Sequence, residues 1–439
     1  MNAYPEEERE PNATDPSMPF MALDLVDDKD TTATSTVRSK VLEVFLAFLM
    51  LGLTSFGGPV AHIGYFRREL VQRRAWLTES TFMELVGICQ LLPGPASSQV
   101  GFAIGLSRAG WLGAAAAWTG FTLPSVLAML VFARLTPKLN GWFGQGITHG
   151  LKLAAVVVVA QAVWDMARAL CSGNRRAGIA LVGIALLAVV STSFAQILVI
   201  AVGAGLGSFM CRVPDSFASN DGWQPATSNR TRAVGVIALL LFVFFFIVAM
   251  TAGSAPDGSS VCSIFSAFYR SGALVFGGGH IVLPLLQQQT VATGWVSENA
   301  FITGYGAAQI VPGPLFSFAS FLGFAIGGDS HRWSGAFVAT VSIFLPGLLL
   351  VIAILPFWDM LRGHRTVKAM FVGTNASVVA LLATALYSQI WVNTVKTNVD
   401  FAAAVIGFVL ATRWRVAPVY LVGACAILGT VAALPVWAT

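Results

Sequence analysis

Two stretches of the sequence decide the fold: Gln90-Leu-Leu-Pro-Gly-Pro-Ala-Ser-Ser-Gln99 and, further along, Gln309-Ile-Val-Pro-Gly-Pro-Leu-Phe-Ser317. Each lies within a long apolar run. Proline removes a backbone donor and glycine accepts unusual backbone angles, so each Pro-Gly-Pro must interrupt a helix. A broken helix at membrane depth is tolerated only beside protein or a polar cavity. The sequence therefore predicts two functional helix breaks; the alternative is that the prolines only help helices to pack.

The composition excludes a soluble globular enzyme. Of the 439 residues, 56% are hydrophobic and 11% are charged, whereas soluble proteins average about 25% charged residues. The net charge of +5 comes from Lys and Arg in short gaps between apolar runs, not from the exposed basic face that a nucleic-acid partner requires. The five cysteines show no CxxC or metal spacing, so we expect no disulfide framework, metal site or cofactor.

Thirteen apolar runs follow the acidic N-terminal stretch, and they are much longer than the strands of a membrane barrel. We therefore predict an all-α polytopic membrane protein with about 13 transmembrane segments. The runs are 41–59, 81–107, 111–133, 146–167, 177–192, 194–211, 233–252, 262–286, 300–327, 333–357, 367–391, 400–412 and 416–437.

The order of motifs indicates an internal duplication. Phe56-Gly-Gly-Pro59, the first Pro-Gly-Pro, Gly101-Phe-Ala-Ile-Gly105 and Leu123-Pro124 return in the same order and at nearly the same spacing, the last two as Gly323-Phe-Ala-Ile-Gly327 and Leu345-Pro346. We predict a disordered acidic tail (1–40) that is not a signal peptide, a first repeat (41–211), a polar linker with one connecting helix (212–261) and a second repeat (262–437).

The number of crossings decides how the repeats are related. With six crossings in each copy and one helix between them, the second copy would be inverted relative to the first. If the Pro-Gly-Pro segment were a re-entrant hairpin, each copy would have five crossings and the two copies would be parallel. Assuming that every run crosses, 14 Lys and Arg lie on the side of the N-terminus and 8 on the other, which favours a cytoplasmic N-terminus. Four arginines in 67–74 contradict this count.

The helix that starts after each break presents free N–H groups and the positive end of its dipole, which suits an anion. Hydroxyl and amide donors there fit a tetrahedral oxyanion, and two nearby histidines can donate or titrate, although a lone histidine is more often structural. The candidate substrate-binding residues at these positions are Gln90, Gly94, Ser97, Ser98, Gln99, Gln309, Gly313, Ser317, His62 and His280. The helix-breaking residues are Gly57, Gly58, Pro93, Pro95, Gly277, Gly278, Pro312 and Pro314.

Charged residues inside apolar runs are functional candidates. Arg270 and Lys152 are candidate substrate-binding residues, although Lys152 could equally reach the interface. Glu84 is the candidate for proton coupling, or it starts a helix at the interface. Arg67 and Arg68 begin an arginine-rich segment that is either an interfacial amphipathic helix or an access funnel for anions.

The motifs Phe56-Gly-Gly-Pro-Val-Ala-His62, Gln90 to Gly101, Phe276-Gly-Gly-Gly-His280 and Gln309 to Phe316 together resemble the chromate transporter family in its long two-domain form, over about residues 41–437. The resemblance implies a multi-pass inner-membrane protein that exports chromate, driven by the proton-motive force, with sulfate as competitor. Met50 stands where Arg270 stands in the second copy, whereas members of the family that this sequence resembles are often basic at this position.

Three other interpretations stay open. The substrate could be sulfate or another tetrahedral oxyanion, because the residues cannot name its central atom. A membrane-embedded oxyanion reductase is disfavoured, since paired histidines, a CxxC pair and a flavin motif are missing. A passive channel is the third. No GxxxxGK[ST] loop for ATP is present, and the sequence leaves the oligomeric state, a homodimer included, undecided.

Overall fold

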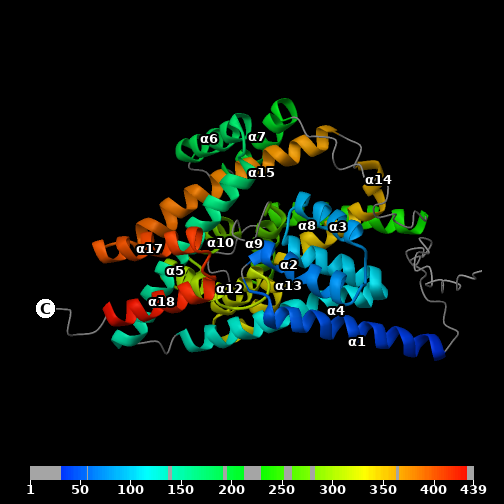
Figure 1. Cartoon of the computed structure of the whole chain (residues 1–439), viewed down its shortest axis with the longest axis horizontal. Coiled ribbons are helices and arrows are strands. Elements are labelled where there is room, and N and C mark those ends of the chain that lie inside the picture. Colours follow the sequence, from blue (N-terminus) through cyan, green and yellow to red (C-terminus); the bar gives the residue numbers. More distant parts are fainter. Residues whose placement is uncertain are drawn as a thin grey trace, which may run out of the picture.

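The computed structural model describes residues 31–56, 58–136, 141–190, 195–211, 229–251, 260–276, 282–361 and 365–432. Within these ranges every element is a helix (Figure 1). This confirms the predicted all-α class. The first part comprises α1 (Thr31–Thr54), α2 (Gly58–Phe66), the π-helical segment η1 (Arg67–Arg73), α3 (Glu79–Leu91), α4 (Ala96–Leu135), α5 (Gly141–Leu170), α6 (Asn174–Val189), α7 (Ala195–Met210) and α8 (Asn229–Thr251).

The second part begins with α9 (Val261–Ala273), α10 (Val282–Thr290), α11 (Glu298–Ala308), the short 3-10 helix η4 (Leu315–Ser317), α12 (Phe318–Ile326) and α13 (Gly328–Ile354). It ends with η5 (Leu355–Phe357), α14 (Trp358–Leu361), α15 (Arg365–Ala385), η6 (Leu386–Trp391), α16 (Val392–Thr394), α17 (Asn398–Arg413) and α18 (Pro418–Ala432). Because α1 begins at Thr31, the C-terminal end of the predicted tail is helical.

Five helices are long and apolar enough to cross a membrane: Ala96–Leu135, Gly144–Leu170, Asn229–Thr251, His331–Phe357 and Lys368–Thr394. Shorter apolar helices cover Ala195–Met210, Leu315–Ile326 and Pro418–Val431. The chain is therefore an integral membrane protein. The number of thirteen crossings is not reproduced by these lengths, and the next two features explain the difference.

The run 81–107, predicted as one span, is a hairpin that enters and leaves by the same end of the bundle. Glu79, at the start of α3, pairs with Arg67 of η1 at 2.6 Å, and Arg74 and Arg108 both lie against Trp76. The start of α3 and the end of the first arm of α4 therefore meet. The Pro-Gly-Pro lies between the two arms at their far end, about 20 Å away along the 13-residue helix α3. The run is therefore two antiparallel arms and not one continuous helix, which favours the re-entrant alternative over a single crossing.

The arginine-rich segment also returns to this end. Glu43 of α1 pairs with Arg74 at 3.6 Å and with Arg108 at 3.3 Å. Consequently α1 and α2 together also run inward and back within the bundle. This places Arg74 beside Arg108 and near Glu43 of α1.

The chain reverses direction within α4 at Ala109 and Gly110, whose backbone angles are not helical. The arms before and after this turn are antiparallel and touch through glycines, since a Cβ on Gly105 would lie 2.4 Å from the carbonyl oxygen of Gly113. The second part repeats the arrangement, with Gly323 of α12 against Gly335 of α13. The short helix η4 accounts for the longer spacing between the second Pro-Gly-Pro and the motif that begins at Gly323.

The two parts are interlocked. Helices α4 and α13 run antiparallel, because Trp118 contacts Phe344 and Arg134 contacts Trp333. Helix α5 packs on α17 and α18, whereas α15 packs on α6 and α7 (Figure 1). The late helices of each half therefore pack on those of the other half, and the helix breaks lie in the interior between them.

Candidate functional site

The two Pro-Gly-Pro turns form sharp tips, each packed against the opposite half of the chain. We call residues 92–95 the first tip and residues 311–314 the second tip. Gly94 and Gly313 have φ angles of 122° and 98°, a region that glycine adopts without strain and other residues rarely adopt. Both tips are therefore fixed in the shape that the sequence motif predicted.

Each tip is held by the opposite half of the chain. The N–H of Gly94 donates to the carbonyl oxygen of Val275 (2.6 Å), and the N–H of Gly313 donates to that of Ser55 (2.9 Å). Ser55 and Val275 are equivalent positions of the two repeats, each directly before a Phe-Gly-Gly motif. The two hydrogen bonds are thus reciprocal.

Buried polar side chains surround the tips, and we call Ser55, His62, Ser97, Ser98 and Ser125 the central polar cluster. All five are at most 2% exposed. His62 Nδ1 lies 3.2 Å from Ser97 Oγ. The hydroxyls of Ser55, Ser98 and Ser125 have no hydrogen-bond partner in the described part of the chain. A buried hydroxyl without a partner lowers the stability of the fold by about 1–3 kcal/mol. Water or a polar ligand that hydrogen-bonds these hydroxyls would therefore bind favourably here.

The three predicted glutamines have different roles. Gln99 Nε2 donates to the carbonyl oxygens of Pro93 (3.0 Å) and Gly347 (3.1 Å), so Gln99 ties the first tip to α13. Gln90 is exposed at the end of α3. Gln309 is half-buried, and its Nε2 has no hydrogen-bond partner among the described residues. Gln309 is thus the one of the three whose amide is buried without a partner among the described residues.

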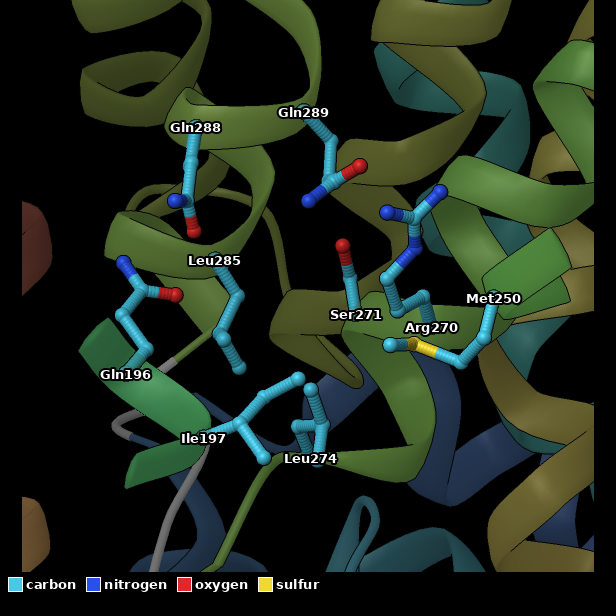
Figure 2. A pocket seen from close by; sticks show the side chains of 9 residues that line it. All are labelled: Gln196, Ile197, Met250, Arg270, Ser271, Leu274, Leu285, Gln288 and Gln289. Carbon is cyan, nitrogen blue, oxygen red and sulfur yellow. The ribbon is translucent and has the colours of Figure 1, made fainter. Parts of the chain in front are cut away.

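A pocket next to the first tip contains Arg270 (Figure 2). We call it the Arg270 pocket; its lining comes from α7 (Gln196, Ile197), α8 (Met250), α9 (Arg270, Ser271), α10 (Leu285, Gln288, Gln289) and the adjoining Leu274. Among the described residues, Arg270 Nε is buried without a hydrogen-bond partner, and no carboxylate pairs with this guanidinium. Figure 2 shows the polar ends of the three glutamines and of Ser271 directed toward the same space.

The Arg270 pocket and the first tip are directly connected. Leu274 lines the pocket, and the next residue, Val275, accepts the hydrogen bond from Gly94. The structure thus brings Arg270 and Gly94 into one region. Gln196, Gln288 and Gln289 were not predicted from the sequence to belong to the site. Consecutive glutamines directly after an apolar run were a signal for the last two.

Other predicted residues lie elsewhere. Lys152 Nζ donates to Asn299 Oδ1 of α11 at 2.7 Å, and Glu84 Oε1 accepts from Trp358 Nε1 of α14 at 2.8 Å. Ser317 is buried in η4, where its carbonyl oxygen accepts from Ser320 Oγ. Gly58 begins α2 with a positive φ of 83°. Gly57, Gly277, Gly278 and His280 lie outside the described residues.

The arginine-rich segment is mostly charge-paired. Arg67 pairs with Glu79, while Arg73 and Arg74 donate to Glu69 at 3.0 and 2.7 Å. Burial alone would raise the pKa of Glu69, but the hydrogen bonds from these two arginines lower the pKa below its usual value. Arg68 is exposed. Paired guanidiniums attract a distant anion less than free ones, which weakens the funnel interpretation.

The fold and these sites define an integral membrane protein whose interior has interrupted helices and buried polar groups. Among the described residues no cluster of three His, Cys, Asp or Glu could hold a metal ion. The chain belongs to the chromate transporter family: the family model, described as chromate transporter, matches residues 42–208 and 262–430.

Curated relatives agree with this assignment. The chain is 28% identical over 346 residues to the chromate transport protein of Pseudomonas aeruginosa, covering 77% of this chain and 79% of that protein. It is 25% identical over 365 residues to the chromate transport protein of Cupriavidus metallidurans (81% and 85%). It is also 27% identical over 343 residues to a probable chromate transport protein of Synechococcus elongatus (77% and 82%).

Proposed function

We propose that this protein is a secondary transporter that exports chromate across the cell inner membrane, is driven by the proton-motive force and confers chromate resistance. Family membership and the names of the relatives support chromate as the substrate. They also support transport as opposed to an enzymatic reaction.

The observation that carries the proposal is the Arg270 pocket. A guanidinium inside a membrane protein is costly unless an anion compensates its charge, and the described residues offer no carboxylate to it. Gln196, Gln288 and Gln289 add side-chain amides that can hydrogen-bond oxygen atoms, whereas the Ser271 hydroxyl donates to the carbonyl oxygen of Ala267. A tetrahedral dianion fits these requirements, because charge-assisted hydrogen bonds to a guanidinium are strong and geometrically specific.

The binding region extends from this pocket toward the tips. The central polar cluster supplies buried hydroxyls without partners in the described part of the chain, Ser98 after the first tip and Ser55 and Ser125 beside the second tip. Helix starts such as Ala96 add N–H groups that favour negative charge. We infer that chromate binds first near Arg270 and moves past the first tip, where Ser97 and Ser98 take over part of its coordination.

We infer that the two repeats are inverted. In parallel copies the end of α4 would lie beside the end of α13, whereas Arg134 contacts Trp333 at the start of α13. Replacing two crossings per copy by two re-entrant hairpins keeps the number of crossings even, as inversion requires. Moving Arg67, Arg68, Arg73 and Arg74 to the side of the N-terminus changes the balance of basic residues from 14 against 8 to 18 against 4. This ratio supports a cytoplasmic N-terminus.

Proton coupling is assigned to Glu84. It is an acid within the re-entrant hairpin of the first tip, and its carboxylate already interacts with Trp358 of the second half. A proton on Glu84 would weaken this contact between the two halves. We therefore infer that protonation of Glu84 affects substrate binding through α3, which connects Glu84 to the first tip.

Uptake of labelled chromate into everted inner-membrane vesicles tests the function. Accumulation that requires energisation, is abolished by an uncoupler and is reduced by excess sulfate supports active export. Saturable uptake of sulfate without chromate would establish the sulfate alternative. Formation of trivalent chromium by the purified protein would establish the reductase alternative. Flux that does not saturate and ignores the uncoupler would indicate a channel.

Two matched substitutions test the pocket. Arg270→Gln removes a charge-assisted contact to the anion, worth about 1.5–3 kcal/mol, so the KM for chromate should rise by about 10- to 150-fold. Lys152→Gln removes an equal charge from a side chain that contacts Asn299, and its effect should be smaller. Arg270→Lys, checked for monodispersity, controls for folding. Equal losses in the two Gln variants would contradict the assignment.

A further inference from the structure

Oxygen atoms from two helices converge on the second tip. A Cβ added to Gly313 would clash with Ser125 Oγ, and it would lie 3.2 Å from the carbonyl oxygen of Phe121 and 3.3 Å from that of Gly52. Ser125 and Phe121 belong to α4, whereas Gly52 belongs to the end of α1. Three oxygens therefore surround one side of Gly313, and only a residue without a side chain can lie among them.

The hydroxyl of Ser125 does not make the hydrogen bond that is usual in a helix. Other buried hydroxyls donate to the carbonyl oxygen four residues earlier, as those of Ser271 and Thr340 do at 2.8 and 2.7 Å. Ser125 is fully buried, yet its Oγ has no partner in the described part of the chain. The same is true of the buried hydroxyl of Ser55, whose carbonyl oxygen accepts from Gly313.

Two features of the backbone leave carbonyl oxygens available at this place. The last helical hydrogen bond of α1 runs from Ser55 to Leu51, so Gly52 lies in the final turn, where carbonyl oxygens lack helical donors. In α4, Pro124 offers no N–H to the carbonyl oxygen of Gly120, which lies 2.9 Å from the position of a Cβ on Gly52. The end of α1 is also the negative end of its dipole, which favours a cation.

We propose that the second tip binds a monovalent metal cation of the size of Na⁺, held by the oxygens of Ser125, Ser55 and Gly52 together with carbonyl oxygens of α4. None of these oxygens belongs to a carboxylate, so the ligand set does not balance the charge of a divalent ion. Carbonyl oxygens cannot donate, so they disfavour an anion. Free carbonyl oxygens at the ends of interrupted helices are suited to Na⁺ inside membrane proteins. The proposal does not rest on chromate as the substrate.

The duplication does not provide a second copy of this site. With the offset that relates the two Leu-Pro motifs, the counterpart of Ser125 is Gly347. Gly347 has no hydroxyl, and its carbonyl oxygen already accepts from Gln99 Nε2 at 3.1 Å. The same amide donates to the carbonyl oxygen of Pro93 in the first tip. The first tip thus meets an amide donor, whereas the second tip meets acceptor oxygens and hydroxyls without partners among the described residues.

Equilibrium binding of radioactive Na⁺ to the purified full-length protein tests the proposal, without chromate and with choline chloride to hold the ionic strength constant. The wild type should bind Na⁺ saturably. Ser125→Ala removes one ligand oxygen and should weaken binding about tenfold. The variant should stay folded and monodisperse, because the hydroxyl of Ser125 has no hydrogen bond to lose among the described residues.

Ser342→Ala is the matched control. Ser342 is a buried serine of α13 that precedes Pro346, and its hydroxyl donates to the carbonyl oxygen of Val338 at 2.6 Å. This variant should bind Na⁺ as the wild type does. Lack of saturable Na⁺ binding by the wild type, or equal affinity of the wild type and Ser125→Ala, would overturn the proposal. Displacement of Na⁺ by equimolar Ca²⁺ would also overturn it, because the site would then be divalent. Because chromate is absent, these results are independent of the proposed transport function.

Discussion

Replacing Gly94 by alanine should destabilise the protein through the first tip. Gly94 has a φ of 122°, and an added Cβ would lie 2.8 Å from the Cα of Gly347 in α13. The left-handed backbone costs about 1–2 kcal/mol for a residue with a side chain. The contact is with backbone, which cannot move aside as a flexible side chain can, and such overpacking costs about 1–3 kcal/mol. We expect the free energy of unfolding to fall by about 2–5 kcal/mol.

Unfolding in mixed micelles with increasing dodecyl sulfate, followed by circular dichroism, measures this change. Gly87→Ala is the matched control, because Gly87 lies in α3 of the same hairpin and nothing is within 4 Å of its added Cβ. Alanine is favoured over glycine in a helix by about 0.5–1 kcal/mol, so this variant should be at least as stable as the wild type. If Gly94→Ala unfolds at the same denaturant concentration as Gly87→Ala, the described tip geometry and its contact with α13 are refuted.

Three further predictions concern the cluster, the arginine-rich segment and the topology. Ser97→Ala with Ser98→Ala should lower chromate uptake into everted vesicles without loss of monodisperse protein, since Ser98 Oγ has no partner to lose among the described residues; undiminished uptake would remove both from the site. Glu69→Gln should remove about 1 kcal/mol of stability. The wild type has this contribution above the unfolded carboxyl pKa near 4.5 and loses it as the pH falls through the lowered pKa of the folded state. If the free energy of unfolding falls by the same amount between pH 6 and pH 3.5 in both proteins, this prediction is contradicted. Cysteines placed at Arg68 and Arg134, in a chain whose own cysteines are replaced by serine, should react with an impermeant maleimide from opposite faces of the membrane, and labelling from one face would contradict the inferred topology.

The helix breaks were predictable because Pro-Gly-Pro acts locally. Gly94 and Gly313 need only their own backbone angles to form the tips. The hairpin was not predictable from hydropathy, because both of its arms are apolar. The hydropathy of 81–107 is the same whether the run folds into two short arms or forms one continuous span. The conflict of Arg67 to Arg74 with the charge count was the sequence signal that the chain folds back here, since basic residues on the unexpected side indicate a segment that does not cross.

The site was predictable only where a residue type is unusual by itself. Arg270 was found because an arginine in an apolar run is rare. Gln196 belongs to α7 of the other half, far from Arg270 along the chain, and only the packing of α7 beside α9 and α10 brings it into the same pocket. Lys152 has the same charge as Arg270, but its partner Asn299 could not be inferred from the order of residues.

The reciprocal hydrogen bonds connect the two tips to equivalent positions of the repeats, but the side chains that precede these positions differ in charge. From Gly94 the path leads through Val275 and the chain that precedes it to Arg270, a cation. From Gly313 the corresponding path leads through Ser55 to Met50, which has no charge. Under the proposed function, a displacement of the first tip would therefore move the cation that binds the anion, whereas the same displacement of the second tip would move only an apolar side chain. The two halves would then share one mechanical connection, while only the connection at the first tip would reach a proposed substrate-binding residue.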